Sequence, residues 1–315
     1  MPLCIFCVGE IMRTYRASGI APLSGVLIAL IAGLIAAIVM GGLLYAIDHY
    51  AGFYLIVVFP AVAGAVTGFA LSKAINLGKV RNSAVAALLS MIAAIALVGT
   101  YHYGKYQLEL KDDARQFLIS KNLLVTDATV NETTDEFLKS ETGATGFIGF
   151  LQLEAQQGIS ITRSSSSNGL ELKGVWYWVY SAVEFGIVLA VIAGIAWAAA
   201  IEPFNEAQQQ WYGPAQVILT APGANAKPLE TALKGSAFEE AGALLQRDAS
   251  PLPRVEFAVK QTPTKDPENV IITANLVQQN GKNESKTEFA TGLVSQRELE
   301  RVLSGAVVSL EPAVG

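Results

Sequence analysis

Residues 24–47 read SGVLIALIAGLIAAIVMGGLLYAI, a run without a single charged side chain. A helix needs about 20 mostly apolar residues to cross a bilayer, and only helices and closed barrels satisfy their backbone hydrogen bonds in lipid. Three further runs of this kind cover residues 52–72, 83–103 and 175–201. The sequence therefore predicts a mainly α membrane protein built on a four-helix transmembrane bundle.

The composition of the 315 residues agrees with this prediction. Hydrophobic residues make up 52% of the chain and charged residues only 16%, against about 25% charged in ordinary soluble domains. The net charge is −5, so the chain lacks the basic surface that a nucleic-acid-binding protein needs. We exclude a simple cytosolic enzyme and a nucleic-acid partner, and we expect membrane lipid around the bundle.

Basic residues near the spans indicate an orientation, because Lys and Arg are retained on the cytoplasmic side. Five of them precede the first span or separate the second from the third: Arg13, Arg16, Lys73, Lys79 and Arg81. The short turn at residues 48–51 has none. We expect a cytoplasmic tail (residues 1–23), an extracytoplasmic cap (104–174) and a cytoplasmic C-terminal domain (202–315), in a multi-pass protein of the plasma (inner) membrane.

Small residues recur at four-residue spacing in three of the spans, which permits close helix approach in lipid. These ladders are Gly25, Ala29, Gly33, Ala37 and Gly41 in the first span; Pro60, Gly64, Gly68 and Ser72 in the second; and Ala182, Gly186, Ala190, Gly194 and Ala198 in the fourth. We expect them to pack against one another within one chain; the alternative is a face for a homo-oligomer. Pro60 predicts a kink in the second span.

The cap carries seven basic and ten acidic residues. Amphipathic patterns predict helices at residues 112–124 and 145–157, and alternation predicts a hairpin that pairs residues 159–163 with 170–172. A segment of this length has little core of its own. We expect the cap to pack against the outer ends of the spans.

The C-terminal domain has an α+β pattern. Alternating residues predict strands at 216–220, 255–259, 270–277 and 287–293, and Asn280-Gly281 predicts a hairpin turn between the last two. Two capping boxes, Ser236 with Glu239 and Ser295 with Glu298, predict helices that extend to about Arg247 and Gly305. We expect three or four mostly antiparallel strands.

This domain has ten basic and fourteen acidic residues, and it contains no His and no Cys. It also lacks a phosphate loop and a dinucleotide fingerprint. We interpret it as a module that binds protein partners, and we expect no cofactor.

Cys4 and Cys7 form a Cys-x-x-Cys pair, and they are the only cysteines of the chain. This spacing suits thiol exchange, and it presents two thiolates to zinc. One pair is only half of a zinc site, so a metal would need ligands from a second chain. Ordinary reduced thiols or a lipid-modified tail is the simpler interpretation.

Ionisable residues gather near the outer boundary of the spans. Both histidines of the chain, His49 and His102, fall there, with Asp48 beside the first, and Glu184 lies within the fourth span. An ionisable residue inside a span costs about 2.5–3.5 kcal/mol on insertion scales and is a functional candidate by default. Glu184 is either a proton or cation site with these neighbours, or a partner in a hydrogen bond between helices.

Three functional hypotheses follow. The first is a non-enzymatic membrane scaffold, assembly or sensor protein that couples the cap to the C-terminal module. The second is a transporter or channel subunit that uses Glu184 with His49 and His102. The third is a membrane enzyme with a metal at these residues and Asp48; no nucleophile motif adjoins the histidines.

Overall fold

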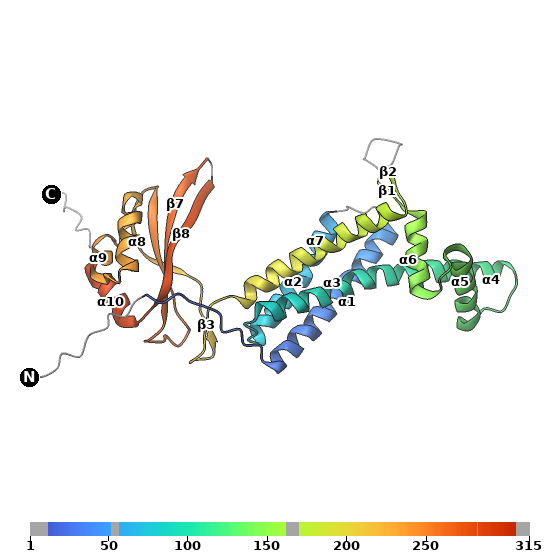
Figure 1. Cartoon of the computed structure of the whole chain (residues 1–315), viewed down its shortest axis with the longest axis horizontal. Helices are drawn as coiled ribbons and strands as arrows, with labels where there is room; N and C mark the ends of the chain where they lie inside the picture. Colours follow the sequence, from blue (N-terminus) through green and yellow to red (C-terminus); the bar gives the residue numbers. More distant parts are fainter. Residues whose placement is uncertain (1–11, 52–56, 162–169, 282, 307–315) are drawn as a thin grey trace, which may run out of the picture. The chain divides into compact units, whose positions relative to one another are not determined.

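The computed structural model describes residues 12–51, 57–161, 170–281 and 283–306 (Figure 1). The chain divides into two compact units. One unit comprises Ser18–Ile201, and the other combines Met1–Ala17 with Glu202–Gly315. The two units are described separately.

Four helices of the first unit are long and apolar enough to cross a membrane. They are α1 (Leu23–Ala51), α2 (Val58–Leu77), α3 (Ser83–Lys105) and α7 (Val175–Ala200). Large apolar side chains such as Ile31, Phe69 and Ile95 are more than half exposed on their outer faces, as a lipid environment favours. Four apolar helices of spanning length, as predicted, are confirmed.

The second span is shifted from its predicted position. Helix α2 begins at Val58 and continues to Leu77, so Lys73 lies inside the helix; residues 52–56 are outside the described chain. Pro60 is consequently the third residue of the helix, where its missing N–H removes no intrahelical hydrogen bond. The predicted kink at Pro60 is wrong, because the helix starts at that point.

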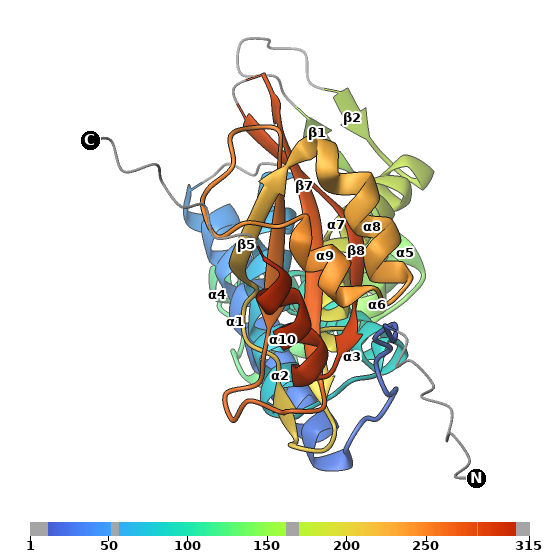
Figure 2. The ribbon, with the colours of Figure 1, turned by 90° about the vertical axis from the view of Figure 1, so that its left-hand side faces the viewer.

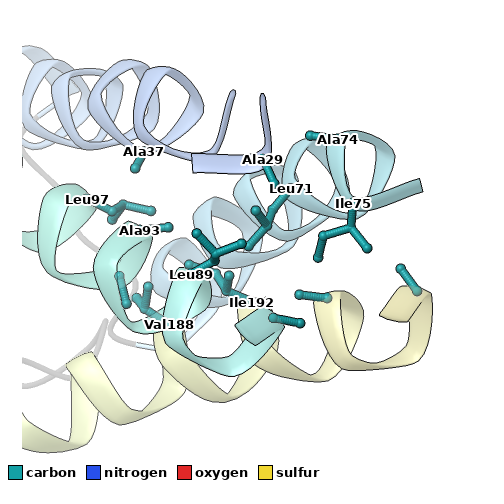
Figure 3. Packing of buried hydrophobic residues seen from close by; sticks show 14 of the residues in the cluster. Ala29, Ala37, Leu71, Ala74, Ile75, Leu89, Ala93, Leu97, Val188 and Ile192 are labelled. Atoms are coloured by element: carbon teal, nitrogen blue, oxygen red, sulfur yellow. The ribbon is translucent and has the colours of Figure 1, made fainter. Parts of the chain in front are cut away.

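The ladder of α1 packs within the bundle, as predicted, but its glycines meet residues outside the ladders of α2 and α7. All five of its small residues are buried. A Cβ atom on Gly25 would lie 1.9 Å from the carbonyl oxygen of Gly78, and one on Gly41 would lie 2.3 Å from that of Leu97. Only glycine permits these backbone contacts, which bring α1 against the end of α2 and against α3 (Figure 3).

The ladder of α2 packs on α7. A Cβ on Gly64 would lie 3.1 Å from the carbonyl oxygen of Val188, and one on Gly68 would lie 3.2 Å from Cα of Ile192. Val188 and Ile192 join the same apolar core as Leu71 of α2 (Figure 3).

The ladder of α7 does not pack within the bundle, contrary to our expectation. All five of its residues are exposed, and a Cβ on Gly186 or Gly194 would meet no atom within 4 Å. The helix instead turns inward a second stripe with four-residue spacing, Val188, Ile192 and Ala196. The spacing of small residues in a sequence identifies a stripe that allows close packing, but it does not determine which helix packs against that stripe.

The cap begins as a direct continuation of α3. A π-helical segment, Tyr106–Leu110, leads into α4 (Lys111–Ser120). Helices α5 (Asp127–Thr142) and α6 (Gly146–Gln157) follow, and β1 (Ile159–Ile161) pairs antiparallel with β2 (Leu170–Leu172). The helices near residues 112–124 and 145–157 are confirmed, as is the pairing of residues 159–161 with 170–172; residues 162–163 of the predicted hairpin lie outside the described residues.

Helix α5 was not predicted. Its buried residues, Val130, Thr134 and Leu138, follow a four-residue spacing in which only two are apolar. Thr126 caps its first turn through a box with Thr129 instead of an acidic residue, which further weakens the sequence signal.

The second unit contains a four-stranded antiparallel sheet of order β5-β6-β7-β8. The strands are β5 (Gln216–Pro222), β6 (Arg254–Lys260), β7 (Val270–Asn280) and β8 (Asn283–Val294). Helices α8 (Ala226–Lys234), α9 (Phe238–Ala243) and α10 (Gln296–Gly305) cover one face of this sheet (Figure 2). The predicted α+β pattern is confirmed, and the sheet is fully antiparallel.

The two capping boxes have different outcomes. Ser295 and Glu298 form the predicted box at the start of α10. The prediction at Ser236 is wrong: its φ is +59°, α9 starts at Phe238 without a side-chain cap, and the helix ends at Ala243. Helix α8 was not predicted.

The segment before α1 belongs to this second unit. Arg13 and Leu293 exchange two backbone hydrogen bonds, of 3.1 and 2.7 Å, at the edge of β8. The hydroxyl of Tyr15 donates to the carbonyl oxygen of Glu202 and accepts from the N–H of Phe204. Phe204 lies in a short strand, β3 (Phe204–Asn205), which pairs with β4 (Gln210–Trp211). Hydrogen bonds thus join the segment just before α1 to the segment just after α7.

Candidate functional site

Glu154 on α6 is the centre of a polar cluster at the base of the cap. Its Oε2 lies 2.9 Å from Nδ1 of His102 and 3.1 Å from the hydroxyl of Tyr177. Its Oε1 lies 3.2 Å from Nζ of Lys105. We name these four residues the Glu154 cluster; they join α6 to α3 and α7.

The Glu154 cluster is well shielded from water. The side chains of Glu154 and His102 are 12% and 13% exposed, and that of Lys105 is 25% exposed. Burial by itself would raise the pKa of Glu154, but the hydrogen bond from His102 and the positive charge of Lys105 outweigh it, so the pKa lies below its ordinary value. Glu154 is therefore held as a carboxylate that accepts from three donors.

The local sequence explains why Glu154 points inward. Phe147, Phe150 and Glu154 occupy one helical stripe of α6, and Phe150 packs with Tyr106 in the small core of the cap. A charged residue in an otherwise apolar stripe needs partners when it is buried. His102 and Lys105 supply them from the last turn of α3.

Asp48 is linked to the Glu154 cluster through α3. Its Oδ2 accepts a hydrogen bond of 2.7 Å from the hydroxyl of Tyr101 and lies 3.8 Å from Nζ of Lys105. Lys105 therefore stands between two carboxylates, one on α1 and one on α6.

His49 belongs to a separate, more exposed pair. Its Nδ1 lies 3.2 Å from Oε1 of Glu109, and the two side chains are 41% and 35% exposed. The ring stacks on Tyr45 at a centroid distance of 5.6 Å. The two histidines thus have different carboxylate partners.

Glu184 faces the interior of the bundle and is half-buried. The hydroxyl of Tyr180, one turn earlier, is hydrogen-bonded to its carboxylate. Glu184, Tyr101 and His102 line a cavity of about 10 Å³, which has room for a single water.

The structure thus unites only part of the predicted site. His102 and Glu184 line one cavity, and Asp48 contacts Tyr101 and Lys105 beside it, whereas His49 lies in its own pair. Among the described residues, no group of three or more His, Cys, Asp or Glu side chains is arranged to hold a metal ion. Cys4 and Cys7 lie outside the described residues.

The central residues Glu154 and Lys105 were not predicted. A signal for Glu154 is present, since it follows Phe147 by two helical turns and interrupts an apolar stripe. Lys105 follows Tyr101 by one turn, but nothing in the sequence relates it to α6. Tyr177, whose hydroxyl donates to Glu154, was not predicted as a site residue either.

Comparison with known proteins adds no relative. No protein-family model, curated protein or solved structure matches the chain. The functional argument therefore depends on the geometry. Chemically, the Glu154 cluster holds a buried carboxylate between donors from α3 and α7, and it joins the cap to the bundle.

Proposed function

We propose that the chain is a non-enzymatic membrane scaffold or sensor that couples the cap to the C-terminal domain. The Glu154 cluster carries this proposal, because it fixes α6 to α3 and α7 through three separate contacts. Helix α7 continues from this cluster to residues 201–203, which lead directly into β3 of the second unit. A displacement of α6 would act on a helix that is covalently joined to the C-terminal domain.

The packing of α7 supports transmission along the helix. Close contacts of Gly64 and Gly68 with its inner face leave little room for the helix to bend independently of α2. The clamp formed by Tyr15, Glu202 and Phe204 holds the segment that follows α7 to the segment that precedes α1.

We propose that both ends of the chain lie in the cytoplasm and that the cap lies outside. The pairing of Arg13 with Leu293 supports placing the N-terminal segment and the C-terminal domain on one side of the membrane. Arg13, Arg16, Lys79 and the buried Arg81 near the same ends of the spans favour the cytoplasmic side. A plasma (inner) membrane location is part of this proposal.

The outward ladder of α7 is the proposed assembly face. Its exposed small residues, with Gly186 and Gly194 at the centre, allow another helix to approach its backbone. We propose a second copy of the chain there, and protein partners on the C-terminal domain.

The geometry gives the transport alternative less support. Glu184 is hydrogen-bonded to the hydroxyl of Tyr180, and the cavity that it shares with His102 holds about 10 Å³. A hydrated cation needs several times the space of one water. A structural hydrogen-bond role suits Glu184 better.

Hydrogen exchange of the full chain in lipid nanodiscs tests the coupling. We expect Glu154→Gln to speed amide exchange in the cap and also in the C-terminal domain, because the contact between α6 and α7 is weakened. Glu136→Gln is the matched control, since Glu136 is an exposed carboxylate on α5. Faster exchange confined to the cap would contradict the coupling.

A further inference from the structure

Strand β8 forms one edge of the sheet in the second unit (Figure 1), and most of that edge is open. It pairs with β7 from Asn283 to Val294. On its other side, Arg13 covers only Leu293. Within the part of the chain that the structure describes, no strand pairs with the outer side of residues 283–291. Such an edge is a template for strand addition, because it presents a row of unpaired backbone N–H and C=O groups.

The geometry of the hairpin shows which backbone groups point outward. Asn280 pairs with Asn283 across a two-residue turn, and such a closing pair exchanges both of its hydrogen bonds. Hydrogen-bonded and non-hydrogen-bonded pairs alternate from there along an antiparallel ladder. Glu284, Lys286 and Glu288 therefore direct their backbone N–H and C=O groups away from β7, toward the open edge.

The side chains of these three residues alternate in sign on one face of the sheet. Glu284 and Lys286 are 54% and 48% exposed, and they already contact Arg254 and Glu256 of β6. Each can form a further ion pair, since a carboxylate accepts several hydrogen bonds and an ammonium group donates three. An edge that carries only lysines would repel a second copy, whereas alternating signs are complementary to an antiparallel copy of the same strand.

The charges and the outward groups select one register for such a pairing. A register centred on Ser285 places Glu284 opposite Lys286 of the second copy, twice by symmetry, and joins them through their outward groups. A register centred on Lys286 would place like charges opposite each other, which is unfavourable. One centred on Thr287 would run into the β-bulge at Phe289.

An open cavity lies where this register brings the end of the second copy's hairpin. The cavity has a volume of about 350 Å³, and its lining includes Met12, Glu288 and Phe289. Continued past Thr287, the register places the turn at Gly281 of the second copy beside Glu288 and Phe289. The turn therefore meets open space at this point instead of packed side chains.

We propose that the C-terminal domains of two copies pair edge to edge through β8, antiparallel, with Ser285 at the twofold axis. The two four-stranded sheets then form one continuous sheet. About four backbone hydrogen bonds and two ion pairs make a weak contact. Confinement of both copies to one membrane strengthens it by raising their effective concentration. This contact is separate from the outward ladder of α7 and from the coupling of the cap.

Disulfide crosslinking of the full chain in proteoliposomes tests the register. In a Cys4→Ser, Cys7→Ser background, Ser285→Cys should form a covalent dimer on oxidation. The Cα atoms of a non-hydrogen-bonded pair are about 4.5 Å apart, within the disulfide range of about 4.4–6.8 Å. The side chain of Ser285 stands on a face of the sheet, so the pairing itself leaves it accessible to the oxidant.

Gln278→Cys is the matched control for this crosslink. Gln278 is exposed and pairs directly with Ser285, one strand further from the edge. In the proposed dimer its two copies are separated by three strand spacings, or about 14 Å, which no disulfide spans. Absence of a dimer from Ser285→Cys, or equal crosslinking of Gln278→Cys, would overturn the proposal.

Charge reversal tests the ion pairs. In the Ser285→Cys chain, Glu284→Lys alone or Lys286→Glu alone places like charges opposite each other, and each should slow crosslinking about tenfold. A mixture of the two variants, carrying tags of different size, restores opposite charges, so the mixed dimer should form within about twofold of the original rate. Mixing cannot restore the contacts with Arg254 and Glu256 inside each chain. A mixed dimer that forms as slowly as the single variants would refute the pairing.

Discussion

Nδ1 of His102, near the end of α3, lies 2.9 Å from Oε2 of Glu154 in the cap, and both side chains are nearly buried. This contact joins two segments that are distant in sequence. It shows why the cap, which has only a small core of its own, does not need to be stable in isolation.

Removing the charge of Glu154 should destabilise the cap. Glu154→Gln leaves His102 without its carboxylate partner and leaves Lys105 only the carboxylate of Asp48, 3.8 Å away. We expect a loss of about 1–3 kcal/mol in the free energy of unfolding. Thermal unfolding in detergent, followed by circular dichroism, measures this loss. Glu136→Gln, on the exposed face of α5, should leave the melting temperature unchanged. Equal melting of the two variants would show that the Glu154 cluster is energetically unimportant.

Acidification should remove the same stabilisation. The pKa of Glu154 in the folded state lies below its ordinary value of 4.5. The carboxylate therefore contributes fully to the free energy of unfolding when the pH is well above 4.5, and this contribution is lost as the pH falls through the folded-state pKa. We expect the wild type to melt higher than Glu154→Gln at pH 7, and this difference to shrink below about pH 4.5. A constant difference down to pH 3 would contradict this assignment.

Adding a methyl group should destabilise the protein at an inward glycine but not at an outward one. Gly25→Ala places a Cβ 1.9 Å from the carbonyl oxygen of Gly78, and such overpacking should destabilise the bundle by about 1–3 kcal/mol. Gly186→Ala meets no atom within 4 Å, so its melting temperature should stay within error of the wild type. Comparable losses in both variants would mean that α7 is packed differently.

Larger residues on the outward ladder should disrupt a homo-oligomer. Gly186→Ile with Gly194→Ile prevents close approach of a second helix, and we expect about a tenfold weaker association, or about 1.4 kcal/mol. Single-molecule subunit counting in nanodiscs measures the oligomeric state. Val183→Ile, at an exposed position off the ladder, is the control. A wild-type chain that is already monomeric would remove the proposed assembly face.

Labelling from one side of sealed vesicles should reveal the topology. In a Cys4→Ser, Cys7→Ser background, cysteines at the exposed positions Thr14 and Ser285 should react with an impermeant maleimide from the same face. A cysteine at Asn131, exposed in the cap, should react only from the other face. Reaction of Thr14→Cys and Ser285→Cys from opposite faces would exclude four crossings.

The elements that are easiest to predict are those with a strong periodic signal. The four apolar helices, the hairpin of β7 and β8, and the box of Ser295 with Glu298 follow from composition, alternation and capping. Helices α5 and α8 are harder to predict. Helix α5 has few apolar residues on its buried side, and α8 is only nine residues long.

The site was predictable in residue type but not in pairing. The distribution of ionisable residues in the sequence predicts His102 and Glu184 as site residues. The main partner of His102, however, is Glu154, on a helix whose position depends on tertiary packing. Likewise, the Ala182-to-Ala198 spacing matches that of the α1 ladder, and only the three-dimensional arrangement separates the inward stripe from the outward one.

The strand-like pairing of Arg13 with Leu293 has a consequence for biosynthesis. The first partner leaves the ribosome before any span, and the second leaves after all of them, so the sheet edge closes only when the last segment has been made. In the proposed topology of four crossings, a chain that failed to insert one helix would carry these two residues to opposite compartments. The pairing of Arg13 with Leu293 would then form only in chains in which every helix had been inserted.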